Sequence, residues 1–318
     1  MRLLGAALAC AALAACGAVS PPREDLPRLA VDAGWMKLPA GTRFGEVSGV
    51  DVDAAGNIWV LHRAGRAWAE PFPADPIPHN TVFKFAPDGT LLDQWGGGQM
   101  VMPHGISVSP DGKVWITDAG REQVLRFASD GRLELELGER GVSAQDAGHF
   151  GRPADVAFLP GRLLVADGYV NTRIAELSPQ GKFLRDWGSF KVAHAVAVDD
   201  ARVYVADREN ARIAVYDHQG KEVAAWASPA GNHTYGLRAL GAGRLLALEG
   251  RDGADRTGAV LRVYGADGAV EGAYDIGLVG EDASRGHDLA IAPGGQVYVT
   301  DAAAGRVVRL TLPGKAMQ

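Results

Sequence analysis

The chain has 318 residues, of which 47% are hydrophobic, 22% charged and 7% aromatic, a composition typical of a globular protein and not of a disordered or fibrous one. Its 42 glycines, roughly 13% against a usual value of about 7%, indicate many tight turns. The net charge is -6 and no basic run occurs, so we expect no nucleic-acid partner. Both cysteines lie within the first sixteen residues, so we expect no disulfide in the folded part.

Residues 1–28 predict a secretion signal followed by a flexible tether. Residues 1–15 have a charged start and an apolar run that is too short for a transmembrane helix of about 20 residues. The Leu-Ala-Ala sequence that ends at Cys16 resembles the lipobox of bacterial lipoproteins, in which the cysteine is lipidated; an ordinary secretory signal is the alternative. Residues 16–28, which contain two adjacent prolines and mixed charges, predict a lipidated tether. We therefore expect a protein of the bacterial cell envelope, lipid-anchored at the outer membrane and facing the periplasm, with no other membrane contact.

An internal repeat from Ser48 to Leu312 predicts the fold. These residues divide into six units of about 44 residues, the length of a four-stranded propeller blade. Each unit holds short runs of alternating apolar residues that are separated by glycine-containing turns, which is the pattern of β-hairpins. We predict an all-β, six-bladed β-propeller over residues 29–318. The last unit stops after its third strand, so we expect residues 29–38 to supply the missing outer strand. A solenoid is the alternative, but no segment has helical periodicity.

Three of the eight histidines occupy one repeat position. His104, His194 and His287 stand at the start of the innermost strand in repeats 2, 4 and 6, where repeats 1, 3 and 5 carry serine, alanine and tyrosine. The start of each inner strand faces the central channel, so alternate blades would place three imidazoles at intervals of about 120°. Three neutral imidazoles with a fourth position left for water or substrate are the ligand set of catalytic zinc, although iron or copper accepts the same ligands.

Five motifs carry a resemblance to a known family. They are LHRAGRAW at 61–68, MPHGI at 102–106, the stretch from DV at 155–156 through ADGYVNTRI at 166–174, ADRENARI at 206–213 and GHD at 286–288. Together they resemble the peptidyl-α-hydroxyglycine α-amidating lyases, which belong to the wider NHL-repeat propeller group, over about residues 47–312. The resemblance implies a propeller of NHL-type repeats and a zinc-dependent carbon–nitrogen lyase that cleaves a small-molecule or peptide α-hydroxyglycine to the amide and glyoxylate.

The resemblance also assigns roles to individual residues. It implies zinc on the three channel histidines, Tyr169 as the base and Arg63 as the partner of the substrate carboxylate, which a planar guanidinium can bind with two parallel hydrogen bonds. It further implies a structural calcium held by the Asp288 carboxylate and by the backbone carbonyls of Val50 and Ile106, which share one repeat position in neighbouring repeats. Oxygen ligands of this kind suit calcium, but a carboxylate that accepts hydrogen bonds from backbone amides is the alternative role of Asp288.

The sequence departs from the family's pattern at several positions. Val170 and Gly151 replace a cysteine pair beside the tyrosine, so we expect the catalytic geometry to rely on packing alone. Arg285 with the next glycine replaces Met-Pro, and Ala193 replaces a proline, which concerns substrate preference. We expect a monomer without a companion hydroxylase domain, so the substrate would be made elsewhere. Two other functions stay open: a metal-dependent, lactonase-like propeller hydrolase and a non-catalytic NHL-repeat binding scaffold.

Overall fold

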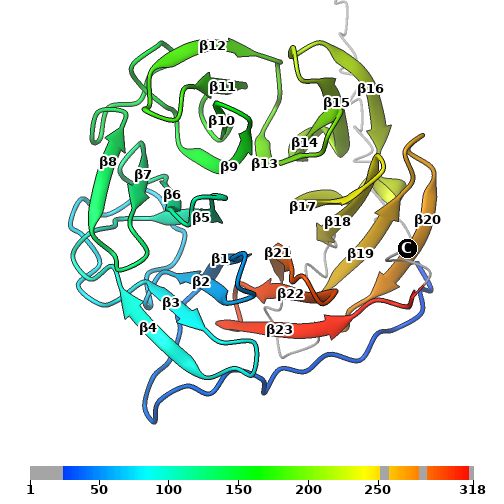
Figure 1. Cartoon of the computed structure of the whole chain (residues 1–318), viewed down its shortest axis with the longest axis horizontal. Coiled ribbons are helices and arrows are strands. Elements are labelled where there is room, and N and C mark those ends of the chain that lie inside the picture. Colours follow the sequence, from blue (N-terminus) through cyan, green and yellow to red (C-terminus); the bar gives the residue numbers. More distant parts are fainter. Residues whose placement is uncertain (1–23, 251–257, 279–284, 315–318) are drawn as a thin grey trace, which may run out of the picture.

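Six β-sheets surround a central axis in the computed structural model (Figure 1), which describes residues 24–250, 258–278 and 285–314. Five of the sheets have four strands and the sixth has three, so the predicted six-bladed β-propeller is confirmed. The predicted signal segment, Cys16 and residues 17–23 of the predicted tether lie outside the described residues. Within the described ranges, no helix has the length and apolar character needed to cross a membrane.

Each blade is an antiparallel sheet whose strands follow one another in chain order. Blade 1 comprises β1 (Val47–Val52), β2 (Ile58–His62), β3 (Val82–Phe85) and β4 (Leu91–Trp95), and blade 2 comprises β5 (Pro103–Val108), β6 (Val114–Asp118), β7 (Gln123–Phe127) and β8 (Leu133–Leu137). Blade 3 comprises β9 (Pro153–Leu159), β10 (Arg162–Asp167), β11 (Arg173–Leu177) and β12 (Phe183–Trp187). Blade 4 comprises β13 (Ala193–Val198), β14 (Arg202–Asp207), β15 (Arg212–Asp217) and β16 (Glu222–Ala227), with the short 3-10 helix η1 (Arg208–Asn210) after β14.

Blades 5 and 6 complete the ring. Blade 5 follows the 3-10 helix η2 (Pro229–Gly231) and comprises β17 (His233–Gly241), β18 (Arg244–Gly250), β19 (Ala259–Tyr264) and β20 (Val270–Asp275). Blade 6 comprises β21 (Gly286–Ile291), β22 (Gln296–Asp301) and β23 (Arg306–Thr311). The first strand of every blade, β1, β5, β9, β13, β17 or β21, lies innermost and contacts the first strands of both neighbouring blades. The residues at the start of these six strands therefore line the central channel.

The hydrophobic core is divided into six clusters, and each cluster fills the space between two neighbouring blades. Between blades 3 and 4, for example, Leu164 and Ile174 of one sheet pack with Val196 and Val203 of the next, and all four are almost fully buried. Successive side chains of a strand point to opposite faces of its sheet, and both faces of every blade are covered by a neighbouring blade. Each strand therefore supplies apolar side chains to the clusters on both sides. The position of one blade is thus fixed by apolar contacts with the blades on either side.

Residues 27–38, here called the N-terminal strap, occupy the place of the missing fourth strand of blade 6 but do not form a strand. Asp32 and Arg309 of β23 exchange both backbone hydrogen bonds, at 2.8 and 2.9 Å, and this is an isolated bridge. The Asp32 carboxylate also accepts a hydrogen bond from Gly34 N–H at 3.0 Å, which turns the chain after a single pair of bonds. The predicted position of residues 29–38 is therefore right, whereas the predicted strand is wrong.

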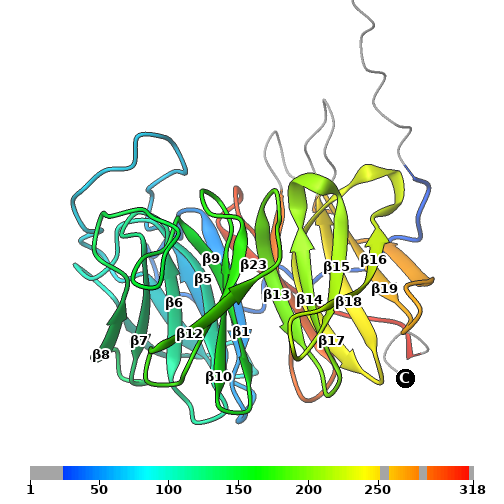
Figure 2. The same ribbon diagram turned by 90° about the horizontal axis from the view of Figure 1, so that it is seen from above.

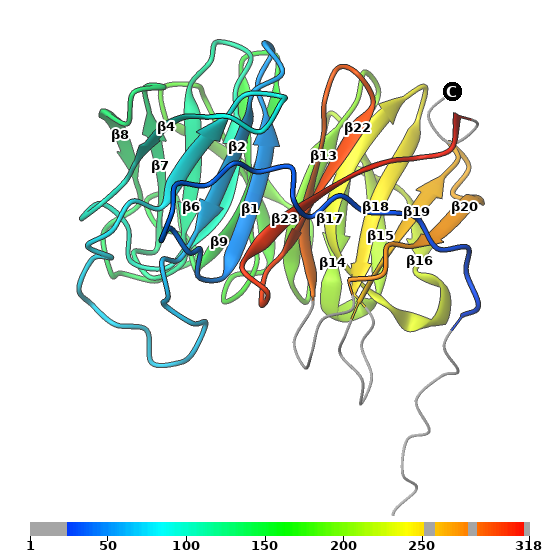
Figure 3. The same ribbon diagram turned by 90° about the horizontal axis from the view of Figure 1, so that it is seen from below.

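The strap closes the ring by crossing three blades (Figure 3). It donates a backbone hydrogen bond to Asp275 O of β20 at one end and to Gly89 O of blade 1 at the other, both at 2.8 Å. Between them Trp35 is 4% exposed, with its ring 4.9 Å from that of Tyr298 in blade 6 and 5.7 Å from that of Phe85 in blade 1. Its indole N–H donates to Val307 O at 3.0 Å. Trp35 thus joins the first and last blades.

Replacing Trp35 with alanine should lower the free energy of unfolding by about 3–5 kcal/mol, because a buried aromatic ring and its hydrogen bond are lost at the ring closure. Urea denaturation followed by circular dichroism measures the change. Leu92→Ala in β4 is the control, since Leu92 is 52% exposed and its loss should cost less than about 0.5 kcal/mol. Equal stability of the Trp35→Ala variant and the wild type would show that the strap does not hold the ring closed.

Candidate metal centre and substrate site

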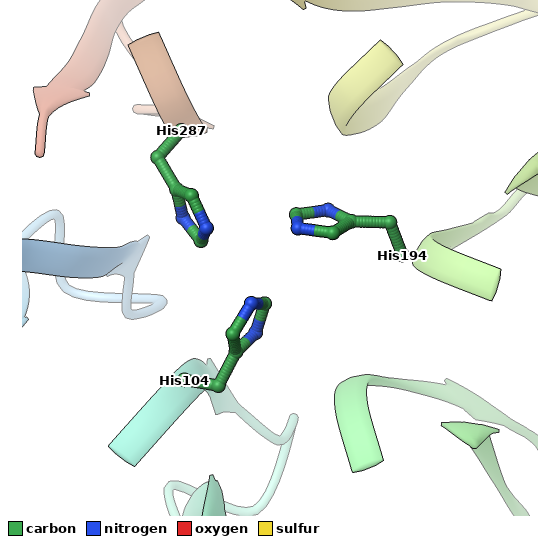
Figure 4. A group of neighbouring side chains, drawn as sticks. All are labelled: His104, His194 and His287. Carbon is green, nitrogen blue, oxygen red and sulfur yellow. The ribbon is translucent and has the colours of Figure 1, made fainter. Parts of the chain in front are cut away.

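The three predicted histidines meet at the channel axis (Figure 4). His104 comes from β5, His194 from β13 and His287 from β21, and each is the second residue of its strand instead of the predicted first. Their ring centroids form a nearly equilateral triangle with sides of 4.8, 4.9 and 5.0 Å. Their potential ligand atoms all lie within 4.8 Å of one another, and among the residues with described positions no other such group of three or more histidine, cysteine or acidic side chains occurs.

Each imidazole is oriented by a hydrogen bond to the next blade. The Nδ1 atoms of His104, His194 and His287 lie 2.8, 2.8 and 2.7 Å from the backbone oxygens of Ala154, Tyr235 and Ser48 in turn. A carbonyl oxygen can only accept, so Nδ1 carries the proton and the lone pair is left on Nε2. The acceptors are the residues at the same repeat position in blades 3, 5 and 1. One repeat position thus supplies imidazoles from the even blades and their carbonyl partners from the odd blades.

The three rings are kept neutral. Burial, with a smaller contribution from the Arg63 guanidinium, lowers the pKa of His104 to about 3. Burial also lowers the pKa of His194 and His287 well below the ordinary value. His194 Nε2 is buried without a hydrogen-bond partner, a costly arrangement for a polar atom. Since neutral imidazole is the form that binds metal, three such acceptors around a cavity of about 10 Å³ fit a single zinc ion.

Tyr169 lies against this ring. It follows β10, and its hydroxyl donates to His104 Nε2 at 3.0 Å, which is the nitrogen that keeps a lone pair. Arg208 Nη1 donates in turn to the Tyr169 oxygen at 3.0 Å. The phenol ring is also packed between His104 at 5.1 Å and Trp68 at 5.0 Å. The structure thus brings the proposed base into direct contact with one proposed ligand.

Arg63 follows β2 and is held in the wall of the same site. Only 3% of it is exposed, its Nε donates to Pro103 O at 3.1 Å, and its Nη1 pairs with the Glu46 carboxylate. Its guanidinium also lies 4.9 Å above the Trp68 ring. Burial lowers the pKa of Arg63 and Glu46 opposes this shift, but a guanidinium stays charged in either case. Arg63 therefore places a fixed positive charge near the histidines.

Two further residues of the site were missed by the sequence reasoning. Arg208, the first residue of η1, lies over the rings of Tyr169 at 5.0 Å and Tyr235 at 5.4 Å. Trp68 lies on the long connection between β2 and β3, which projects beyond the ends of the strands (Figure 2), and its ring is 5.6 Å from His104. Both belong to motifs that resemble the lyase family, and this was the available signal. No role could be assigned to them without the contacts to Tyr169.

A hydrogen-bond network holds the loop that carries Tyr169, so the expectation that packing alone fixes this geometry is wrong. Val170 N–H donates to Gly151 O at 3.0 Å, which shows that the two positions of the lost cysteine pair still lie side by side. The buried Asp167 carboxylate accepts from Gly151 N–H at 2.7 Å, from Asn171 Nδ2 at 2.7 Å and from Arg173 Nε at 2.9 Å. A Cβ at Gly151 would approach Asn171 Oδ1 to 2.5 Å, so a cysteine does not fit there.

The residues implied as calcium ligands do meet, but they surround a side chain. Asp288 of β21 accepts from Val50 N–H at 3.0 Å and from Leu289 N–H at 2.8 Å, which is its alternative role. Arg238 of β17 donates to Val50 O at 3.2 Å and lies 3.5 Å from the Asp288 carboxylate. Ile106 lies in β5, next to β1, as the ring order requires. A guanidinium is thus bound to two of the three implied ligands, and calcium does not fit them in this arrangement.

Comparison with known proteins agrees with this fold. The NHL-repeat family model matches residues 100–127. Peptidylglycine alpha-amidating monooxygenase of Rattus norvegicus is 30% identical over 306 residues, which cover 85% of this chain and 31% of that protein. A probable peptidyl-alpha-hydroxyglycine alpha-amidating lyase of Caenorhabditis elegans is 33% identical over 192 residues, which cover 54% and 55%. The chain thus spans between about a third and somewhat over half of the length of these two relatives.

A solved structure shares the architecture. Virginiamycin B lyase of Staphylococcus aureus superposes with a TM-score of 0.57 at 16% identity, over 85% of this chain and 84% of that one, a likeness that concerns the fold alone. The fold and the repeat match define the chain as an NHL-repeat β-propeller. Within that class its relatives are named as peptidyl-α-hydroxyglycine α-amidating lyases, and the resemblance indicated by the motifs is confirmed.

Asn171→Ala should loosen the loop that carries Tyr169, because it removes the bridge from Asp167 to Ala144 O. A lost hydrogen bond of about 1–1.5 kcal/mol should speed hydrogen exchange of the Val170 amide roughly tenfold. Asn210→Ala is the matched control: Asn210 makes the same bond to Asp207 in blade 4, and its loss should leave Val170 unaffected. Wild-type protection of Val170 in the Asn171→Ala variant would contradict this assignment.

Proposed function

We propose that the protein is a zinc-dependent lyase that cleaves N-acyl- or peptidyl-α-hydroxyglycine to the amide and glyoxylate. The observation that carries the proposal is the position of the Tyr169 hydroxyl, 3.0 Å from His104 Nε2 and bonded to Arg208. With the Nε2 lone pair on zinc, the hydroxyl would give up its bond to His104 and be available to a substrate. A proton acceptor, a neutral three-histidine centre and two fixed cations then lie within one site. The relatives named as amidating lyases support the same chemistry.

We also propose the lipid-anchored, cell-envelope location that the lipobox at Cys16 predicts.

The three Nε2 atoms would hold zinc, which supplies a Lewis acid toward the substrate hydroxyl. The residues of the chain would do the rest. Arg208 donates to the Tyr169 oxygen and holds it beside the histidines, where Tyr169 would act as the base that accepts the hydroxyl proton. As the carbinol carbon becomes the aldehyde of glyoxylate, its bond to the amide nitrogen breaks. That nitrogen takes the same proton back from Tyr169 and leaves as the amide. Atoms and charge balance without an oxidant or a reductant.

The charges and the aromatic wall support this class of substrate. Arg208 lies over the Tyr169 ring, and Arg63 lies over the Trp68 ring, which packs against Tyr169. Each guanidinium is also paired with a glutamate, so a substrate carboxylate would bind through the remaining N–H groups. Trp68 packs against Phe72 with ring centroids 4.7 Å apart, and both side chains are partly exposed. An apolar acyl group or peptide side chain could lie on this surface. An N-acyl-α-hydroxyglycine has both the anionic and the apolar part.

Alanine at His104, His194 or His287 should each abolish zinc binding, because two imidazoles remain where a catalytic site uses three protein ligands. We expect about one zinc per wild-type chain and less than about 0.1 in each variant by elemental analysis. His79→Ala is the control, since His79 is exposed and outside the channel, and this variant should keep its zinc. Zinc retained in two of the three channel variants would refute the shared site.

Tyr169→Phe should keep zinc but lose about 10² to 10⁴ in the rate of glyoxylate release from N-benzoyl-α-hydroxyglycine, because only the positioned hydroxyl is removed. Tyr274→Phe in the outer strand β20 makes the same change away from the channel and should retain the wild-type rate. Zinc-loaded wild type without glyoxylate release would overturn the lyase and favour a hydrolase. A fully active Tyr169→Phe variant would keep the lyase and remove Tyr169 as its base.

A further inference from the structure

A second layer of charged residues lies in the channel, further along the inner strands than the histidines. Asp288 of β21, Asp51 of β1 and Asp155 of β9 come from three different blades, and Arg238 of β17 comes from a fourth. The side chains of Asp288, Asp51 and Arg238 are only 16, 19 and 21% exposed. Three carboxylates in a largely buried channel need compensating positive charge. Arg238 is the cation that the structure places among them.

Each carboxylate is fixed by backbone amides of the next inner strand. Asp288 accepts from Val50 N–H at 3.0 Å, Asp51 from Val108 N–H at 2.7 Å and Asp155 from Val196 N–H at 3.0 Å. These bonds link blade 6 to blade 1, blade 1 to blade 2 and blade 3 to blade 4. The carboxylates therefore have fixed positions and cannot gather freely around an added ion. They do not form a cluster of metal-binding size among the described residues.

The Arg238 guanidinium bonds to one carbonyl oxygen of this layer and lies close to two of its carboxylates. Its Nη2 donates to Val50 O at 3.2 Å and lies 3.5 Å from Asp288 Oδ1 and 4.0 Å from Asp51 Oδ1. Its Nη1 donates to Leu237 O at 2.8 Å, which holds the fork in place. Burial alone would lower the pKa of Arg238, but the three carboxylates raise it above its ordinary value. The side chain is thus a permanent cation in a prepared anionic environment.

We propose that Arg238 takes the place of the structural calcium that the family resemblance implies, so that this propeller needs no calcium. Calcium requires six to eight oxygen ligands at about 2.3–2.6 Å. Here Val50 O and Asp288, two of the three implied ligands, already bind a guanidinium. A divalent ion at the same atoms would also be repelled by the positive charge of Arg238. This role of Arg238 affects stability and metal content, and it is independent of the lyase activity.

The consequence is a channel whose two cation sites differ in kind. The histidine ring would take a dissociable metal, whereas Arg238, a cation that is part of the chain, compensates one charge of the layer of Asp51, Asp155 and Asp288. Burial raises the pKa of all three carboxyls, which also limits the negative charge there. A covalently attached cation cannot be diluted away, so the links between the inner strands should be independent of the calcium concentration.

The test is thermal unfolding of the zinc-loaded protein in metal-depleted buffer without a chelator. Calcium is added up to about 10 mM, a concentration above the dissociation constants of the weakest protein calcium sites. We expect the wild type to hold no calcium by elemental analysis and its Tm to change by less than about 1 °C. Arg238→Met keeps the bulk of the side chain but removes the charge. This variant should have a lower Tm without calcium and gain about 5 °C when calcium is added.

Arg238→Lys is the matched control, since it keeps a positive charge and should stay insensitive to calcium. If Arg238→Met does not fold alone, the yield of refolding with and without calcium gives the same readout, and refolding only with calcium supports the proposal. Wild type that contains about one calcium per chain, or whose Tm rises with calcium, would overturn it. An Arg238→Met variant that is indifferent to calcium in both measurements would also overturn it.

Discussion

The hydrogen bond from each channel imidazole to the next blade is the interaction on which the site depends. A free imidazole exchanges its proton between two nitrogens and rotates about two bonds, so three of them converge on a point only if each is held. Here every Nδ1–H is committed to a carbonyl oxygen, which leaves Nε2 as the acceptor at the axis. Because donor and acceptor lie on neighbouring inner strands, the bond that sets the tautomer also ties two blades together. The same three hydrogen bonds therefore fix both the orientation of the histidines and the positions of the neighbouring blades.

A centre built from alternate blades needs all six blades in register. An apolar cluster fills all six junctions between blades, but only five of them are also bridged by the continuous chain. The junction between blades 6 and 1 joins the two ends of the repeat array. The N-terminal strap covers that junction with few backbone bonds and one large side chain, Trp35. His287 donates to Ser48 O across the same junction. The closure of the ring thus positions one of the three imidazoles as well as stabilising the fold.

The repeat period was sufficient to predict the blades and the meeting of three histidines, because alternation defines strands and equal spacing defines equal places in the ring. Contacts between segments without a common period were not predictable in this way. Arg208 and Trp68 reach Tyr169 from loops of different length, so no repeat alignment marks them. Arg238 stands at an ordinary strand position, and its meeting with Val50 depends on a long side chain that extends across the channel. The strap does not form a strand because the local turn at Asp32 competes with continued backbone pairing to β23.

The same register separates charge along the channel, and this separation bears on how a substrate would bind. Arg63 follows β2 and Arg208 follows β14, which are the second strands of blades 1 and 4. The last residue of each of these strands pairs with the first residue of the inner strand, so both guanidinium groups lie at the end of the channel where the inner strands begin. The carboxylates of Asp51 and Asp155 bond amides at Val108 and Val196, further along the inner strands. The histidine ring lies between the two layers and is neutral. Each arginine is paired with a glutamate, Glu46 or Glu209, so this end offers an anion guanidinium N–H donors and not a net positive charge. Under the proposed function, the carboxylate would point toward the arginines, and the hydroxyl on the adjacent carbon would face the histidine ring.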